Sequence, residues 1–222
     1  MGDLAAYVEF SRTLDLEVNE LVQRLAAAIR LRGLPQLRDV VPALGGLALH
    51  FHAAFEGDRV AATAAIVAEL LGKRLPAADS LGRDVEVPVC FDPEFGLDLE
   101  ELSQRAKIDA EGIQKAFCAA HYRVLMIGFA PGHAYLGGLP EKLSVPRRAL
   151  PRAVVPAGSV AIANRQAVVY PFAISGGWSV LGRTPLVLFD AGRSRPSLFS
   201  PGDRVRFRAI AKSTFLEMAE KQ

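Results

Sequence analysis

Helical and strand-like patterns alternate along the first third of the chain. Apolar side chains recur at the spacing of one helix face between Asp15 and Gly33, and a second helix is expected between Asp58 and Gly72. Three shorter apolar runs predict strands at Leu4–Phe10, Leu37–Ala43 and Leu47–Ala53. The resulting β-α-β-β-α order indicates a split α+β unit, to which Val85–Phe91 can add a further strand.

A segment without periodicity, Lys73–Arg83, is the best linker candidate and precedes a strand-rich second part. Asp98 and Glu101 have the spacing of a capping box, which predicts a helix from Asp98 to about Ala106. A second short helix is expected from Asp109 to about His121. Beyond it, turn signals recur about every ten residues, as in barrels and sandwiches. The candidate strands are Tyr122–Phe129, Val154–Val155, Val160–Ala163, Ala167–Tyr170, Val180–Leu181, Leu186–Phe189 and Val205–Ile210.

Composition and charge exclude several classes of partner. The 222 residues are 50% hydrophobic and carry a formal net charge of +2. They can bury a sizeable core, but the charge is too small to favour nucleic acid or an anionic membrane. No signal peptide is apparent, and the most apolar stretch, Val60–Leu71, is too short to span a bilayer. The arginines between Arg193 and Arg208 are interpreted as solvated barrel surface. We therefore expect a soluble, cytoplasmic protein.

The residues that most often bind metals are sparse. Cys90 and Cys118 are the two cysteines, and they lack metal-ligand spacing, so reduced thiols are expected. His50 and His52 share one face of a predicted strand, but two histidines without a third ligand make a weak metal site. Walker A, G-x-G-x-x-G, H-E-x-x-H and G-x-S-x-G patterns are also absent. No metal is therefore predicted within the chain.

The stretch from Ile127 to Thr184 concentrates glycine, proline, arginine and aromatic residues more densely than packing requires. His133 lies in a Pro-Gly-rich loop, where it can exchange a proton, bind an anion, or simply hold the loop. Tyr135 can offer its hydroxyl to a ligand or anchor the same loop. Prolines flank three arginines, at least one of which can face a carboxylate or a phosphate: Arg147, Arg148 and Arg152.

Further candidates in this stretch each have a structural alternative. Ser159 follows a glycine and can present backbone N–H groups to an anion, or it can belong to a tight hairpin. Gln166 and Tyr170 lie on a predicted hairpin and can point into a groove. Trp178 follows two glycines and can wall a ligand or close one end of a barrel, and Arg183 adds a cation. Because spacing provides no nucleophile–base pair, the residues themselves indicate an anion-binding site on a β-rich domain.

These residues also carry a family resemblance. G-F-A-P-G-H-A-Y-L-G-G-L is similar to the G-F-x-P-G-x-x-Y-L-G-G-L signature of the family of 5-oxoprolinase B-type subunits, also called PxpB, KipI or allophanate hydrolase subunit 1. P-R-R-A-L-P-R, V-P-A-G-S-V-A-I-A, Y-P and G-G-W-S-V-L-G-R-T-P resemble its later blocks in the same order. P-G-D-R-V-R-F resembles its closing strand, and G-D-L-A-A-Y-V-E-F its opening motif. The resemblance covers almost the whole chain.

The resemblance implies an α+β fold, with a small split β-α-β N-terminal domain at residues 1–84 and a cyclophilin-like β-barrel domain at residues 85–222. It implies the B-type subunit of an ATP-dependent 5-oxoprolinase, inactive alone, which hydrolyses 5-oxoproline to L-glutamate together with C-type and A-type subunits. The lactam of 5-oxoproline is unstrained and chemically inert, which explains why its hydrolysis would be coupled to activation by ATP. We expect ATP to be shared with the partner subunits.

The resemblance also implies where the site lies. His133 and Tyr135 are expected to be catalytic. The expected substrate- or anion-binding residues are Arg147, Arg148, Arg152, Ser159, Gln166, Trp178 and Arg183. Two rival functions come from other relatives of the family. One is half of a biotin-dependent carboxyltransferase acting on urea or a similar amide, and the other is an inhibitor that binds a histidine kinase.

Overall fold

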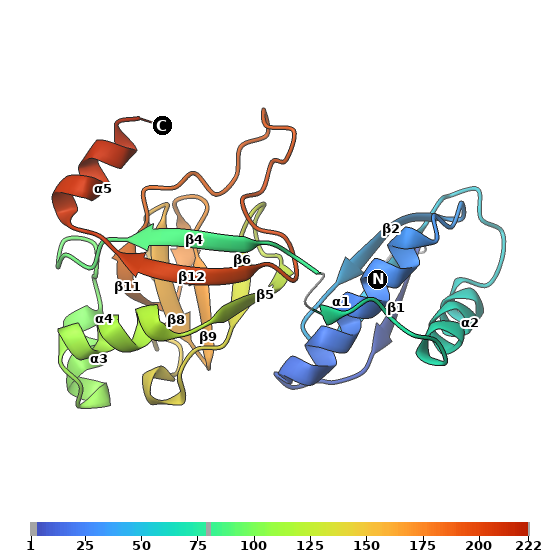
Figure 1. Cartoon of the computed structure of the whole chain (residues 1–222), viewed down its shortest axis with the longest axis horizontal. Helices are drawn as coiled ribbons and strands as arrows, with labels where there is room; N and C mark the ends of the chain where they lie inside the picture. Colours follow the sequence, from blue (N-terminus) through green and yellow to red (C-terminus); the bar gives the residue numbers. More distant parts are fainter. Residues whose placement is uncertain (1–3, 79–80, 222) are drawn as a thin grey trace. The chain divides into compact units, whose positions relative to one another are not determined.

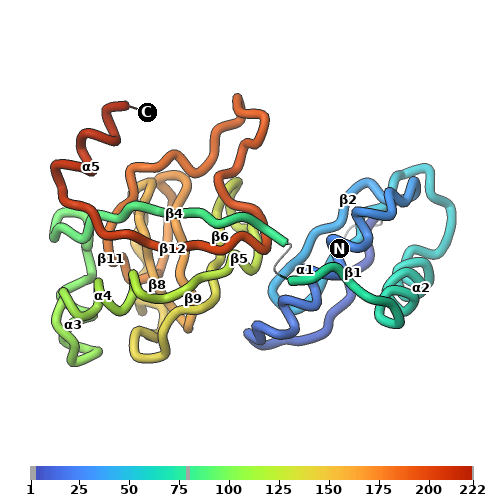
Figure 2. The backbone as a smooth tube through the Cα atoms, viewed as in Figure 1, coloured from blue at the N-terminus to red at the C-terminus, as the bar shows by residue number. Residues whose placement is uncertain are grey.

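The computed structural model describes residues 4–78 and 81–221 and contains two compact units, Met1–Gly82 and Arg83–Gln222 (Figure 1). In Figure 2 the first unit runs from blue to teal and the second from green to red. The boundary expected from the sequence was residue 84. Gly2 and Asp3 of the opening motif, and Asp79 and Ser80 of the predicted linker, lie outside the described residues.

The first unit is a three-stranded antiparallel sheet with two helices. Its elements are β1 (Ala5–Glu9), α1 (Leu16–Leu31), β2 (Leu37–Pro42), β3 (Gly46–Phe51) and α2 (Arg59–Leu71). The strands pair in the order β1-β3-β2. Asp15 and Asp58 begin the two helices, and each carboxylate accepts hydrogen bonds from backbone N–H groups of the first turn. The predicted β-α-β-β-α order is thereby confirmed.

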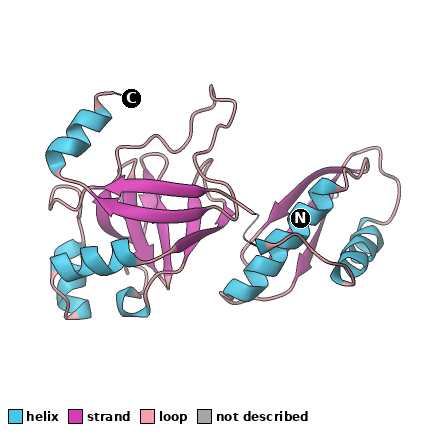
Figure 3. Ribbon diagram, in the orientation of Figure 1, coloured by secondary structure: helices cyan, strands magenta, loops and turns pink. Residues whose placement is uncertain are grey.

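The second unit is built on a seven-stranded sheet that forms a barrel (Figure 3). Its strands are β4 (Asp84–Val89), β5 (Tyr122–Ile127), β6 (Ala134–Gly137), β8 (Ser159–Ala163), β9 (Gln166–Val169), β11 (Ser179–Arg183) and β12 (Arg204–Ala209). The order is β11-β8-β9-β6-β5-β12-β4, in which only β12 and β4 pair in parallel. Cys90 and Arg183 exchange backbone hydrogen bonds of 2.8 and 2.9 Å, which join the two edge strands. The expected α+β fold with a barrel domain is confirmed.

Smaller elements surround the barrel. They are α3 (Leu99–Ala106), α4 (Ala110–Ala119), the short 3-10 helix η2 (Glu141–Leu143), β7 (Arg152–Val155), β10 (Ile174–Gly176) and α5 (Lys212–Ala219). Strands β7 and β10 pair only with each other, as a two-stranded sheet. Helix α3 packs on β11, and α4 packs on β12.

Two strand predictions need correction. The run Val85–Phe91 does not join the first sheet, because β4 pairs with β12 along its whole length in the barrel. The run Leu186–Phe189 is not a strand: Phe189 makes one isolated bridge to Ser197. Two backbone hydrogen bonds of 2.8 Å, from Asp190 N–H to the Pro196 carbonyl and from Leu198 N–H to the Leu188 carbonyl, flank this bridge. Strands β6 and β10 and helix α5 were not predicted.

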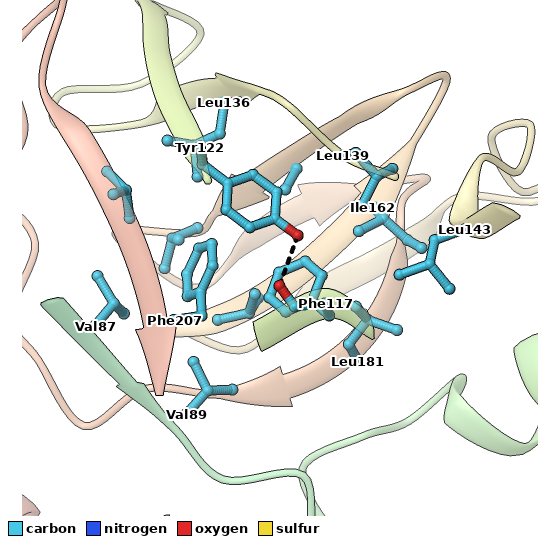
Figure 4. Packing of buried hydrophobic residues seen from close by; sticks show 14 of the residues in the cluster. Val87, Val89, Phe117, Tyr122, Leu136, Leu139, Leu143, Ile162, Leu181 and Phe207 are labelled. Carbon is cyan, nitrogen blue, oxygen red and sulfur yellow. Dashed lines mark hydrogen bonds between the residues drawn. The ribbon is translucent and has the colours of Figure 1, made fainter. Parts of the chain in front are cut away.

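The barrel interior is filled by large apolar side chains (Figure 4). Phe117 from α4 lies with its ring centroid 4.7 Å from that of Phe207 and 5.1 Å from that of Tyr122. The Tyr122 hydroxyl donates a 3.0 Å hydrogen bond to the Phe117 carbonyl, so its one polar group is satisfied inside the core. Helix α4 is thus held against the barrel wall.

Side-chain alternation along the strands produces a second, outer cluster. On β8, Val160 and Ile162 belong to the interior core, whereas Ala161 and Ala163 belong to a separate buried cluster on the other face. The other buried members of the outer cluster lie on or next to β7, β9 and β11: Val155, Val168, Tyr170, Trp178 and Val180. Tyr135 of β6 and Ile174 of β10 are partly buried and pack against this cluster. The outer face of this part of the barrel is therefore packed with buried side chains, and these side chains position the site described below.

The hairpin between β8 and β9 turns through Asn164 and Arg165, whose φ angles are +48° and +66°. Ala163 and Gln166 close the turn as a strand pair, which is the geometry of a two-residue type I′ loop. Glycine adopts positive φ without the steric cost that arginine has. We expect Arg165→Gly to raise the free energy of unfolding by about 0.5–1 kcal/mol, measured by urea denaturation. An equal or lower stability would contradict this assignment of the turn.

Candidate functional site

Asp98 is the centre of an ion-pair network on the barrel. Its carboxylate accepts hydrogen bonds from Arg148, from both terminal nitrogens of Arg152 at 2.7 Å, and from the Val180 backbone N–H at 2.7 Å. The Asp98 side chain is only 2% exposed. Asp98 occupies the N-cap position of α3, as the sequence predicts, but the predicted capping box does not form, since the Asp98 side chain makes no capping hydrogen bond. The carboxylate is instead directed toward the two arginines.

This network offsets the charge of two predicted anion-binding residues. Glu101 adds a second carboxylate, 2.9 Å from Arg148. The hydrogen bonds from Arg152 to Asp98 raise the pKa of Arg152 above its ordinary value. Arg148 also donates its backbone N–H to the Gly177 carbonyl at 2.8 Å, which ties the arginine segment to the loop before Trp178. Arg148 and Arg152 therefore hold α3, β7 and this loop together.

Aromatic rings form a continuous cluster beside this network. The Tyr135 ring lies 6.0 Å from the indole of Trp178 and 5.0 Å from the imidazole of His133, between ring centroids. The His133 ring in turn lies 5.3 Å from Tyr170 and 5.5 Å from Phe129. Gly176 is required beside this cluster, because a Cβ there would come within 2.2 Å of the Tyr170 hydroxyl oxygen. Residues from three separate segments, 129–135, Tyr170 and 176–178, thus meet in one cluster.

Arg147 supplies the free positive charge of this cluster. Its guanidinium lies 5.5 Å from the centroid of the Trp178 ring, and no carboxylate of the described residues pairs with it. Burial raises the pKa of Tyr135, and it raises the pKa of Tyr170 to about 12, while the charge of Arg147 opposes both shifts. Both hydroxyls are therefore protonated at neutral pH. A guanidinium that lies over an aromatic ring and has no carboxylate partner among the described residues is suited to binding a carboxylate.

His133 is uncharged in this environment. It is 2% exposed, and burial lowers the pKa of its imidazole to about 4. Its Nδ1 is buried and has no hydrogen-bond partner among the described residues. At neutral pH the ring can accept or donate a hydrogen bond but carries no charge to attract an anion.

The remaining predicted site residues are dispersed. Gln166 lies at the start of β9, and its Nε2 is buried without a hydrogen-bond partner. Ser159 is buried on β8, directly opposite Arg183 on β11. The Arg183 guanidinium donates to the Ala157 carbonyl at 2.7 Å and lies over the ring of Phe215. No contact joins Arg183 to the aromatic cluster within the described part of the chain, so the structure separates it from the other candidates.

The described residues show neither a metal cluster nor a membrane-spanning helix. Within residues 4–78 and 81–221, no three His, Cys, Asp or Glu side chains gather in a way that would hold a metal ion. Over the same residues, no helix is long and apolar enough to cross a membrane. The arginines of β12 form surface pairs with β4, Arg204 with Asp84 at 2.8 Å and Arg208 with Glu86 at 2.7 Å.

Comparison with known proteins identifies the family. The family model described as "Carboxyltransferase domain, subdomain C and D" matches residues 1–199. The 5-oxoprolinase B-type subunit of Bacillus subtilis is 34% identical over 97% of this chain and 93% of its own length. That of Haemophilus influenzae is 45% identical over 63% of this chain and 65% of its own length.

A solved structure agrees with this assignment. The crystal structure of TTHA0988 is similar with a TM-score of 0.79 and 34% identity over 93% of this chain. The match spans only 40% of the TTHA0988 chain, so that protein carries a long additional segment. Sequence and fold agree, and the chain belongs to the family of 5-oxoprolinase B-type subunits.

Proposed function

We propose that this chain is the B-type subunit of an ATP-dependent 5-oxoprolinase, and that it opens 5-oxoproline to L-glutamate only together with C-type and A-type subunits. The names of its relatives support the reaction. The observation that carries the proposal is the position of Arg147 over the Trp178 ring, as a guanidinium without a carboxylate partner among the described residues. 5-Oxoproline combines a carboxylate with a small lactam ring whose carbon atoms are apolar, and the carboxylate and these carbons match the guanidinium and the aromatic rings of this cluster.

In this proposal Arg147 binds the substrate carboxylate, and the hydroxyl of Tyr135, which is only partly buried, donates a hydrogen bond to it. The indole of Trp178 provides an apolar wall for the ring. Arg148 and Arg152, which the sequence suggested as anion ligands, instead position the arginine segment through Asp98. Gln166 lies next to this face, whereas Ser159 and Arg183 are assigned no ligand contact.

The described cluster contains no activated nucleophile, which is why we assign the hydrolytic step to the assembled complex. His133 is buried and uncharged at neutral pH, so it orients the ligand and is a poor general acid. ATP, shared with the partner subunits, supplies the activation that an unstrained amide needs. The B-type subunit then contributes binding and orientation of the lactam.

Arg147→Ala in the assembled complex tests this assignment. A charge-assisted hydrogen bond contributes about 1.5–3 kcal/mol, so the KM for 5-oxoproline should rise about 10- to 100-fold. The kcat should change less, because carboxylate binding is the same in the ground state and the transition state. The KM is obtained from ATP-dependent glutamate release at varied 5-oxoproline. Arg206→Ala, which removes an exposed arginine of β12, is the matched control. A KM within twofold of that control would exclude Arg147 as the carboxylate ligand.

The name of the matching family model favours one second candidate, half of a biotin-dependent carboxyltransferase acting on urea or a similar amide. That function requires a biotin carboxylase partner and bicarbonate. Carboxylation of urea by this chain with such a partner, and no glutamate release from 5-oxoproline with A-type and C-type subunits, would favour it over the first proposal.

A further inference from the structure

Phe129 combines backbone strain with exposure. Its φ angle is +73°, and it is the one aromatic residue among the described non-glycine residues with positive φ. The loop between β5 and β6 holds it there through hydrogen bonds of 3.0 Å from the Gly128 N–H to the His133 carbonyl and from the His133 N–H to the Ala130 carbonyl. A left-handed conformation costs a bulky residue about 1–3 kcal/mol. Because the Phe129 side chain is 69% exposed, core packing does not explain the strain.

The Phe129 ring lies against an imidazole that carries an unpaired polar atom. Its ring meets that of His133 edge to face at 5.5 Å, and Tyr135 and Tyr170 flank the imidazole on other sides. The buried Nδ1 of His133 makes no hydrogen bond with the described residues. An unsatisfied polar group of this kind costs about 1–3 kcal/mol. The strained backbone and the unpaired nitrogen lie in one loop, four residues apart.

We propose that Phe129 is a movable cover over a subsite for a small cyclic amide, in which the amide group hydrogen-bonds to Nδ1 of His133 while the Phe129 ring packs on the ligand's ring carbons. This inference rests on the proposed function and assigns the lactam end of the substrate, whereas Arg147 was assigned the carboxylate end. An amide suits this subsite because it offers both an N–H donor and a carbonyl acceptor, so either tautomer of the imidazole can bind it. An anion does not suit it, because aromatic rings and an uncharged imidazole surround the position.

The same two features favour movement of the cover. Both the positive φ of Phe129 and the unpaired Nδ1 raise the free energy of the empty, closed loop. Opening relieves the strain and lets Nδ1 reach water or a ligand. A ligand that satisfies Nδ1 then stabilises the closed state, so closure is coupled to occupancy.

NMR of the chain labelled with 15N-histidine tests the subsite. The probes are 2-pyrrolidinone, which has the lactam ring without the carboxylate, and 5-oxoproline. Both are expected to shift the His133 ring nitrogens saturably. Phe129→Ala should weaken 2-pyrrolidinone binding about 10-fold, a loss typical of removing one apolar ring contact. Phe172→Ala removes another exposed ring, which meets the ring of Phe189 edge to face at 5.9 Å, and should leave the affinity unchanged.

A second variant separates the contribution of the ring from that of the backbone strain, because Phe129→Ala removes the ring alone. Phe129→Gly removes both, so it should be at least as stable as the unsubstituted chain and bind 2-pyrrolidinone as weakly as Phe129→Ala. If Phe129→Ala and Phe172→Ala bind 2-pyrrolidinone with equal affinity, Phe129 is not a cover of the subsite. His133 nitrogens that respond to 5-oxoproline but not to 2-pyrrolidinone would overturn the amide subsite and leave the proposed function standing. Nitrogens that respond to neither probe would also overturn the subsite, whereas glutamate release by the complex decides the proposed function separately.

Discussion

Asp98→Ala is expected to lower the free energy of unfolding of the barrel unit by about 3–5 kcal/mol, the usual cost of removing one partner from a buried ion pair. The Asp98 side chain is 2% exposed and accepts hydrogen bonds from Arg148, Arg152 and the Val180 N–H. Without it, Arg152 and the Val180 N–H lose the carboxylate that accepts their hydrogen bonds, and Arg148 keeps only Glu101 as a carboxylate partner. Urea denaturation monitored by fluorescence of Trp178, which lies in this unit, measures the loss.

Glu101→Ala is the matched control for Asp98. Glu101 also pairs with Arg148, at 2.9 Å, but its side chain is 46% exposed. Solvent screens such a pair, so its loss should cost less than about 1 kcal/mol. If Asp98→Ala and Glu101→Ala destabilise the protein equally, Asp98 does not organise the arginine segment.

His133→Phe is expected to remove a large part of the acid sensitivity of folding. Burial lowers the pKa of His133 from 6.5 to about 4, so between these pH values the unfolded chain binds a proton that the folded protein does not. Stability therefore falls as pH falls from about 6.5 to 4, and this residue alone accounts for about 3 kcal/mol at about 1.4 kcal/mol per pKa unit. Phenylalanine fills the aromatic surroundings without titrating.

The measurement compares unfolding free energies of both proteins at several pH values between 7 and 4. Their difference should move in favour of His133→Phe by about 3 kcal/mol across this range. The side chains that face His133 are Phe129, Tyr135 and Tyr170, and none of them changes charge there, because burial raises the pKa of both tyrosines. A difference that is independent of pH would show that His133 is protonated equally in both states.

Local signals in the sequence predicted local structure well. The caps at Asp15 and Asp58 satisfy donors two and three residues away, so their spacing was sufficient. Asp98 has an equally good capping pattern, but its actual partners lie 50, 54 and 82 residues further along the chain. Nothing in a local pattern reports such contacts. The three-arginine segment itself was the one available signal that a buried carboxylate had to lie nearby.

The sequence predicted some residues of the site correctly and left others undecided. The motif stretch indicated His133, Tyr135 and Trp178, which the structure brings together. It did not show which arginine is free, because that depends on Asp98 reaching two of the three. Arg183 belongs to the same motif stretch, but strand direction and register place it against Ala157 and Phe215. Strand register depends on pairing between distant segments, and spacing alone does not predict it.

The most direct test of the proposed function is ATP-dependent release of glutamate from 5-oxoproline by this chain combined with A-type and C-type subunits from the same organism. We predict release only when all three subunits and ATP are present, and none from this chain alone. An equal rate in the mixture that lacks this chain would contradict the proposal.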